Sequence, residues 1–227
     1  MTNEGDKIDM SNFFNIDNGL FTVLGKICDI MIISIIWILL CIPIITIGPA
    51  NTALYYATVK VIRRDRGYLT REFFRSFKLN FKRGAIIGVI LTAFTFFLGF
   101  DLLWAWSGMN IVENSSMLFG VFLALTIMLI CVSIYIYPLL SRFDMTVRQL
   151  IKASLFMSIR HLPSTVVMFI ITAASVIGIY FVHILIFIIP AGTTFLISLL
   201  MERIFKKYMP ESEGPGEETG VDEWYLE

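Results

Sequence analysis

The sequence predicts an all-α membrane protein, a polytopic bundle of five or six spans with a basic amphipathic helix at the membrane interface. Three observations lead to this prediction. Hydrophobic residues make up 57% of the 227 residues and charged residues only 16%, whereas soluble domains usually contain about 25% charged residues. Several apolar runs reach the roughly 20 residues that a helix needs to cross a hydrocarbon core of about 30 Å. The charges lie between these runs: nine of the eighteen Lys and Arg fall between Lys60 and Arg83.

The N-terminal part combines a polar segment with the first apolar run. Residues 1–19 are polar, and the first clear run covers 30–47. No basic region precedes the run and no A-x-A-like site follows it, so we expect it to be retained as a span and not cleaved as a signal peptide. A proline interrupts its end, and because proline lacks a backbone N–H it should kink or end the helix there. The predicted break consists of Pro43, Thr46, Gly48 and Pro49.

Residues 50–64 are apolar but short for an ordinary span. Ala53 and Ala57 form a small-xxx-small pair that permits close helix contact. Two interpretations are open, a short returning span and a helix that lies near the interface. If the segment crosses, the protein has six spans and its N-terminus inside. If it does not cross, there are five spans and the N-terminus is outside.

Residues 70–83 form the clearest amphipathic segment. At 100° per residue four of its five basic side chains fall within an arc of about 60°, and its phenylalanines fall within about 100° on another side. The four are Arg71, Arg75, Lys78 and Lys82. Such a helix is predicted to lie in the interface, with the phenylalanines inward and the basic groups toward lipid phosphates or water. It is a candidate for docking a cytoplasmic partner or binding anionic lipid head groups through Arg71, Phe73, Phe74, Arg75, Phe77, Lys78, Phe81 and Lys82.

The rest of the membrane domain, which we place at 20–207, contains four further predicted spans at 84–106, 117–140, 164–182 and 184–201. A second cytoplasmic-side helix is expected at 146–160, because Thr146 and Gln149 have the spacing of a capping box. The last segment, 208–227, is acidic and is expected to be disordered. The basic segments should face the cytoplasm under the positive-inside rule, which places the C-terminus inside.

No residue pattern indicates a catalytic, nucleotide-binding or metal-binding site. We therefore expect no enzyme activity, no cofactor and no metal, and the three cysteines are expected to be reduced packing residues. Ionisable groups in or near spans are functional candidates, because burial of charge in lipid is expensive. These candidates are Lys26, Asp29, Asp101 and His183. Structural interpretations also exist, since Lys26 and Asp29 are one helical turn apart and could neutralise each other.

Two stretches carry a family resemblance. Residues 39–57, LLCIPIITIGPANTALYYA, are followed by 73–81, FFRSFKLNF. With these segments the chain resembles the YesL-like family of small bacterial membrane proteins of unknown function, over most of residues 12–205. The resemblance implies a multi-pass protein of the bacterial plasma membrane in the setting of carbohydrate uptake genes, including sugar ABC transporters. It implies no catalytic residue.

Two functional hypotheses follow. The first is a non-enzymatic membrane accessory protein, with the lipid bilayer, anionic head groups and a sugar ABC transporter subunit as candidate partners. The second is a small membrane transporter or channel component, since broken helices can line substrate paths. Nucleic-acid binding is not expected, because the aromatic side chains of 70–83 lie on its membrane-facing side.

Overall fold

The computed structural model describes residues 19–108 and 115–208, and every regular element in these two ranges is helical, which confirms the predicted fold class. The first half contains α2 (Gly19–Cys41), the 3-10 helix η1 (Ile44–Thr46), α3 (Ile47–Ala57), the π-helix η2 (Thr58–Arg63), α4 (Leu69–Leu79) and α5 (Phe81–Gly108). The second half contains α6 (Ser115–Arg142), α7 (Val147–Arg160), α8 (Leu162–Phe181), the 3-10 helix η3 (His183–Phe187) and α9 (Ile189–Phe205). The N-terminal segment 1–18 and the acidic tail after Tyr208 lie outside the described residues.

Four described helices are long and apolar enough to cross a membrane. They are Val23–Cys41, Phe81–Gly108, Ser116–Arg142 and Leu162–Phe181. The last three contain or nearly coincide with the spans predicted at 84–106, 117–140 and 164–182. The run predicted at 184–201 differs, because its first residues form η3 and the 17-residue α9 starts only at Ile189. Pro190 lies in the first turn of α9, where its missing N–H leaves no helical hydrogen bond unmade.

Helix α3 and its π-helical continuation occupy the centre of the fold. Every residue from 52 to 62 is buried, and Ala53 and Ala57 are fully covered. These small side chains allow neighbouring helices to approach closely, and α3 contacts α2, α4, α5, α6 and α9. Segment 50–64 is thus enclosed by protein, a role that neither of its two predicted interpretations named.

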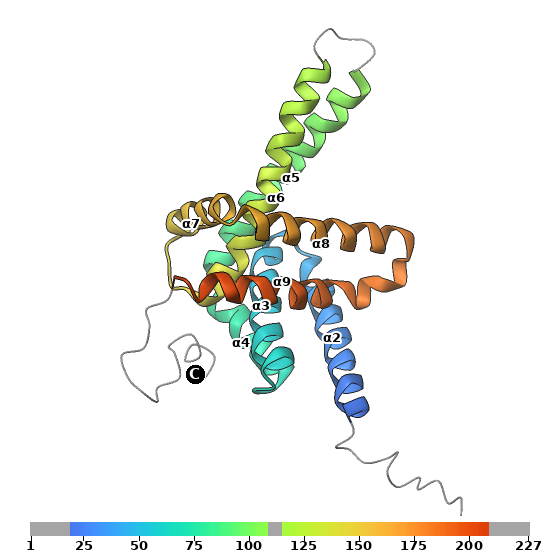
Figure 1. Ribbon diagram of the computed structural model, residues 1–227, viewed down its shortest axis with the longest axis vertical. Coiled ribbons are helices and arrows are strands. Elements are labelled where there is room, and N and C mark those ends of the chain that lie inside the picture. The colour runs from blue at the N-terminus through green and yellow to red at the C-terminus, as the bar shows by residue number, and fades with distance from the viewer. Residues whose placement is uncertain (1–18, 109–114, 209–227) are drawn as a thin grey trace, which may run out of the picture.

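The apolar helices extend from this centre in different directions. In Figure 1 the α5–α6 hairpin projects away from the rest of the molecule, while α8 and α9 form a second hairpin that runs roughly at right angles to it. Helix α2 extends in a third direction. In the most apolar stretch of each candidate span, only 6% to 22% of the residues are buried. Most of the surface of the apolar helices is therefore not covered by protein, and the helices run in different directions.

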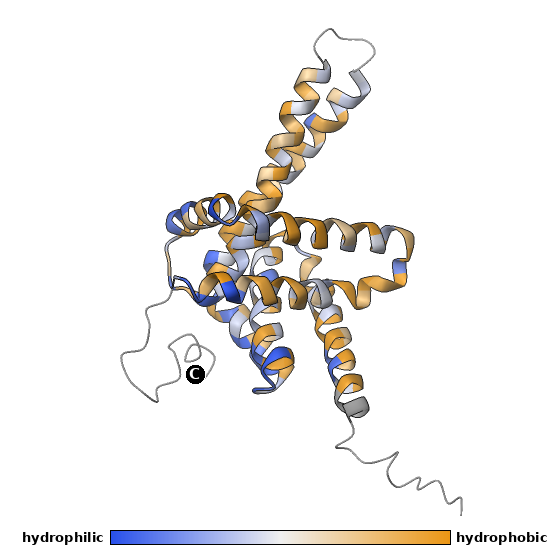
Figure 2. Cartoon of the chain, viewed as in Figure 1, coloured by the Kyte–Doolittle hydropathy of each residue, from blue (hydrophilic) through white to orange (hydrophobic). Residues whose placement is uncertain are grey.

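Hydrophilic residues gather over α4, α7 and the C-terminal end of α9, as Figure 2 shows. The predicted capping box of α7 is confirmed, since the Thr146 backbone N–H donates to Gln149 Oε1 at 2.9 Å. The predicted break after α2 also has a defined cap. Thr46 Oγ1 lies 2.7 Å from the carbonyl oxygen of Pro43 and also hydrogen-bonds that of Leu40. Its hydroxyl thereby satisfies carbonyl groups that the end of the helix leaves open.

Candidate functional site: a buried ion cluster and a basic helix face

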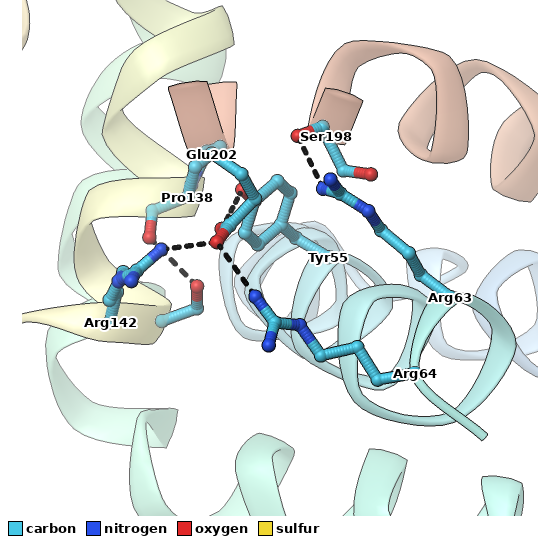
Figure 3. Close-up of polar contacts among 8 residues, drawn as sticks. Tyr55, Arg63, Arg64, Pro138, Arg142, Ser198 and Glu202 are labelled. Atoms are coloured by element: carbon cyan, nitrogen blue, oxygen red, sulfur yellow. Dashed lines mark hydrogen bonds and ion pairs between the residues drawn. The ribbon is translucent and has the colours of Figure 1, made fainter. Parts of the chain in front are cut away.

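A carboxylate buried at the junction of four elements is the most distinctive polar feature of the fold. Glu202 of α9 is 2% exposed. Its Oε1 accepts a 2.9 Å hydrogen bond from the Tyr55 hydroxyl of α3, and its Oε2 pairs with the guanidinium of Arg142 at the end of α6. Arg64, which follows η2, lies 3.9 Å from the same oxygen. Figure 3 shows these groups converging on Glu202.

The cluster contains two arginines, Arg142 and Arg64, and one carboxylate, Glu202. The side chain of Arg142 is fully buried, and its guanidinium also lies 5.3 Å from the centre of the Phe205 ring. Burial, followed by the nearby Glu202 carboxylate, raises the pKa of Tyr55 well above its usual value. Tyr55 therefore stays protonated and donates. Arg63 donates to the carbonyl oxygen of Ser198 at 3.0 Å, so η2 is also joined to α9 directly.

A second buried ion pair fixes α4 to η2. The ammonium of Lys60 lies 2.9 Å from Glu72 Oε2, and the two side chains are 6% and 10% exposed. Lys60 also donates to the Tyr56 hydroxyl at 3.2 Å. Removal of one partner from a buried pair leaves an uncompensated charge. The pair therefore holds the inner side of α4 in a defined position.

We expect Glu72→Gln to lower the free energy of unfolding by about 2–3 kcal/mol, because Lys60 would keep a hydrogen-bond partner and lose its charge partner. Chemical unfolding of the purified chain in a mild detergent measures the change. Asp144→Asn is the matched control, since Asp144 pairs with Arg83 through side chains that are 87% and 47% exposed. Exposed pairs contribute about 0–1 kcal/mol. Equal losses in the two variants would show that burial of the Lys60 pair has no energetic consequence.

The predicted docking helix is α4 with the first residues of α5, and its phenylalanines divide between two environments. Phe73 is fully buried against α3, and Phe77 packs beside it. Phe74 and Phe81 are 40% and 41% exposed. The four basic side chains predicted to bind a partner or lipid, Arg71, Arg75, Lys78 and Lys82, are all exposed. The inner face thus packs on protein, where we expected it to point toward lipid.

The predicted break residues lead into the tightest contact of the fold. Gly48 at the start of α3 meets α5 so closely that a Cβ there would lie 1.9 Å from the carbonyl oxygen of Gly84. It would also lie 2.9 Å from the Cα of Gly88. Pro49 is buried beside it, and Pro43 is exposed. Three glycines therefore allow two helix backbones to touch, as in other close membrane helix contacts.

Of the four predicted polar candidates, Lys26 and Asp29 lie in α2, whereas Asp101 and His183 lie in other elements. Lys26 pairs with Asp65 at 3.0 Å and not with Asp29, so the predicted local neutralisation is wrong. His183 is exposed at the start of η3. Asp101 lies in the outer half of α5, and within the described ranges its buried Oδ2 has no hydrogen-bond partner. Within the described residues, the side-chain partners of Glu202 are Tyr55, Arg142 and Arg64, and none of the four candidates is among them.

A cavity of about 250 Å³ lies beside Tyr55, between α3, α5, α6, α8 and α9. Its lining includes the polar side chains of Asn51, Thr95, Ser133, Tyr137, Thr172 and Thr193. The hydroxyls of Thr95, Ser133 and Thr172 donate to carbonyl oxygens of their own helices. Their oxygens therefore remain available as acceptors. The cavity shares Thr95, Ser133 and Tyr137 with a larger apolar cleft of about 1010 Å³ along the α5–α6 hairpin.

His161, between α7 and α8, gives the fold a pH-dependent contact. Its Nε2 lies 2.9 Å from the Tyr208 hydroxyl. Burial, followed by the charges of Lys207 and Arg160, lowers the pKa of His161 below 6.5. A lowered folded-state pKa means that protonation favours the unfolded chain. The contribution of neutral His161 to the free energy of unfolding is fully present above the unfolded-state pKa of about 6.5. It is lost as pH falls through the lower folded-state pKa.

We therefore expect the midpoint of thermal unfolding to fall between about pH 7 and pH 5 in the native chain, and to fall less in His161→Gln, which keeps a polar side chain at this position. Melting curves recorded at both pH values in one detergent measure the difference. Identical pH dependence in the two proteins would remove His161 as its cause.

Sequence reasoning missed the Glu202 cluster and the glycine contact. Two signals were present. Glu202 is the sole acidic residue between Asp144 and Glu211, and it directly follows the last predicted apolar run, 184–201. Gly84 and Gly88 have the G-x-x-x-G spacing that marks close helix packing. The partners of these residues, Tyr55 and Gly48, lie far away in sequence, so these contacts could be identified only from the folded structure.

The exposed apolar helices and the buried ionic junction define a polytopic α-helical membrane protein. A family model described as "Protein of unknown function, DUF624" matches residues 30–102, which include Gly48, α4 and most of α5. The chain is 22% identical over 199 residues to the uncharacterized protein YesL of Bacillus subtilis (strain 168), a match that covers 86% of this chain and 91% of YesL. The predicted resemblance to YesL-like proteins is thereby confirmed.

A second relative from the same organism is the uncharacterized protein YteU. It is 26% identical over 148 residues, which correspond to 62% of this chain and 64% of YteU. No solved structure matches the chain.

Proposed function

We propose that this protein is a non-enzymatic accessory subunit of the bacterial plasma membrane that binds a partner through the basic face of α4. One observation carries the proposal: buried contacts fix the inner side of α4, and its outer side carries exposed positive charges. Phe73 is fully buried, the Lys60–Glu72 pair is buried, and Arg71, Arg75 and Lys78 are exposed on the opposite side. A rigid element positions a binding surface more accurately than a loop does. The partner surface that fits this face is acidic.

The proposed setting is carbohydrate uptake, with a subunit of a sugar ABC transporter as the partner. Support for this setting comes from the resemblance to YesL-like proteins. Anionic lipid head groups compete for the same cations, because each Lys or Arg close to an anionic leaflet contributes about 1 kcal/mol of attraction. The proposed topology places α4 and the C-terminus in the cytoplasm, as the basic segments indicate. A reporter fused at residue 10 tests the side on which the N-terminus lies.

Partner capture tests the proposal. The full chain is purified in mild detergent from cells grown on sugars that induce it, and copurifying proteins are identified. The triple substitution R71Q/R75Q/K78Q should reduce recovery of the partner at least about tenfold, because exposed complementary charges steer and orient association. The control R148Q/K152Q/K206Q removes the same charge from α7 and the end of α9, where these residues are exposed. Equal recovery with both triple variants would overturn the assignment of α4.

A second candidate function, a transport component, is favoured by the cavity beside Tyr55. Acceptor oxygens line it, and the Glu202 cluster lies at one side of it. Ser133→Cys, in a chain whose Cys28, Cys41 and Cys131 are serine, tests this function. A transport path predicts rapid reaction with a charged, membrane-impermeant thiol reagent in liposomes. Leu139→Cys, at a fully buried core position, is the control. Equally slow reaction at both positions would count against transport.

A further inference from the structure

We propose that the acidic segment 209–227 docks on the basic face of α4 in its own chain and must be displaced before a partner can bind. The observations that carry this inference are the charge of the two surfaces and the point from which the segment starts. The displacement of the segment by a partner rests on the proposed function. The docking itself is a property of the isolated protein.

The basic face of α4 is the surface to which we assign the segment. Arg71, Arg75, Lys78 and Lys82 are all exposed, and in a helical register they fall within an arc of about 60°. Two partly exposed aromatic rings, Phe74 and Phe81, flank these cations. The face therefore fits an anionic segment that also carries apolar side chains.

The acidic segment has both properties. Residues 209–227 contain seven carboxylate side chains and no Lys or Arg. Trp224, Tyr225 and Leu226 follow the carboxylates of Asp222 and Glu223, so apolar groups stand next to charge near its end. Tyrosine and tryptophan rings supply large contact areas at low conformational cost. Charge and aromatic content thus match those of the α4 face.

The contacts of the fold place the start of this segment near α4. Arg64, five residues before α4, lies 3.9 Å from Glu202, which is six residues before Tyr208. Four residues after the C-terminal end of α4, Arg83 pairs with Asp144. Asp144 is two residues after Arg142, which binds Glu202. Both ends of α4 are therefore tied to the neighbourhood from which the acidic segment departs.

The length of the segment is sufficient to reach the face. Helix α3 contacts both α9 and α4, so the axes of α4 and α9 are at most two helix-packing distances, about 20 Å, apart where they pack on α3. A chain of nineteen residues without regular structure would have a root-mean-square span of about 25 Å. Such a tether gives an effective concentration on the order of millimolar. A free acidic partner at a lower concentration therefore meets a face that is already occupied.

Zero-length cross-linking of the full chain tests the docking. A carbodiimide joins a lysine amine to a carboxylate in direct contact by forming an amide, and the carbodiimide takes up the water that is released as it becomes a urea. The chain is held in phosphatidylcholine nanodiscs, and linked peptides are identified by mass spectrometry. We expect links from Lys78 or Lys82 to carboxylates of 209–227. A 1:1 mixture of ¹⁵N-labelled and unlabelled chains should yield links within one isotope only.

Substitutions that spare the reacting lysines make the test specific. R71Q/R75Q should lower the yield of these links about fivefold or more, because it halves the positive charge of the face. R148Q/R203Q, which removes two exposed arginines elsewhere, should leave the yield unchanged. Absence of links at Lys78 and Lys82 overturns the inference, as do links confined to Lys152, Lys206 or Lys207. Links of mixed isotope overturn docking within one chain.

A second measurement does not depend on cross-linking. Neutralising the segment with E217Q/E218Q/D222N/E223Q should raise acetylation of Lys78 and Lys82 by N-hydroxysuccinimide acetate about threefold or more, while Lys152 stays constant. An unchanged Lys78 rate overturns the inference. The same variant should capture more partner than the native chain. Capture that is sensitive to R71Q/R75Q/K78Q but unaffected by the neutralised segment would refute the inference and leave the proposed function standing.

Discussion

Replacing Gly48 with alanine should lower the free energy of unfolding by at least about 3 kcal/mol and sharply reduce the amount of folded protein in the membrane. A Cβ at this position would lie 1.9 Å from the Gly84 carbonyl oxygen and within 3 Å of the Gly88 Cα. Both neighbours are helix backbone, so no side-chain rotation can relieve the clash. Relief requires α3 and α5 to separate, and α3 is the helix that the rest of the fold surrounds.

The chain contains matched controls for this substitution. Gly99 lies in the same helix as Gly84 and Gly88, and Gly192 lies in α9, but an added Cβ at either position meets nothing within 4 Å. Gly99→Ala and Gly192→Ala should be neutral or stabilising by up to about 1 kcal/mol through helix propensity. Yield in the membrane fraction and chemical unfolding in detergent measure both effects. A Gly48→Ala protein as stable as the Gly99→Ala protein would refute the close contact.

Glu202→Gln should cost about 3–5 kcal/mol of folding free energy, because it removes the carboxylate that pairs with the fully buried guanidinium of Arg142. Tyr55 would still find an amide oxygen to which it can donate, so the loss reports charge more than hydrogen bonding. Asp65→Asn is the control, since Asp65 is 70% exposed in its pair with Lys26 and should contribute about 0–1 kcal/mol.

A double variant separates loss of charge balance from loss of packing. Glu202→Gln with Arg142→Gln removes the guanidinium together with its partner. It should therefore be more stable than Glu202→Gln alone, and the coupling energy between the two sites should exceed about 1 kcal/mol. Chemical unfolding of the three variants in one detergent gives this energy. Strict additivity of the two single changes would mean that the pair carries no interaction.

The helices themselves followed from length, charge and proline placement. Runs at 84–106, 117–140 and 164–182 are apolar for as long as a helix needs to cross a bilayer, and this property is local to each run. The break at Pro43 and the capping box at Thr146 are equally local, because the groups involved are neighbours in sequence. These features could be predicted before the fold was known.

The candidate site could be predicted only in part. The basic face of α4 follows from helical periodicity alone, but the burial of Phe73 depends on α3, which periodicity cannot place. In a membrane protein an inward apolar face can meet lipid or protein with similar hydrophobicity. The same ambiguity affected 50–64. Glu202 and Arg142 are 60 residues apart, and pairs at that separation become visible only when the helices are assembled.

The projecting α5–α6 hairpin has a consequence for the thickness of membrane that the protein suits. Its helices have 28 residues each, which corresponds to about 42 Å, whereas the 20-residue α8 measures about 30 Å. Plasma membranes rich in long lipids have hydrocarbon cores only a few Å thicker than average. The outer end of the hairpin therefore extends beyond the acyl chains in an average bilayer. Trp104 and Trp106 are exposed near this end, and tryptophans are enriched where the head groups begin.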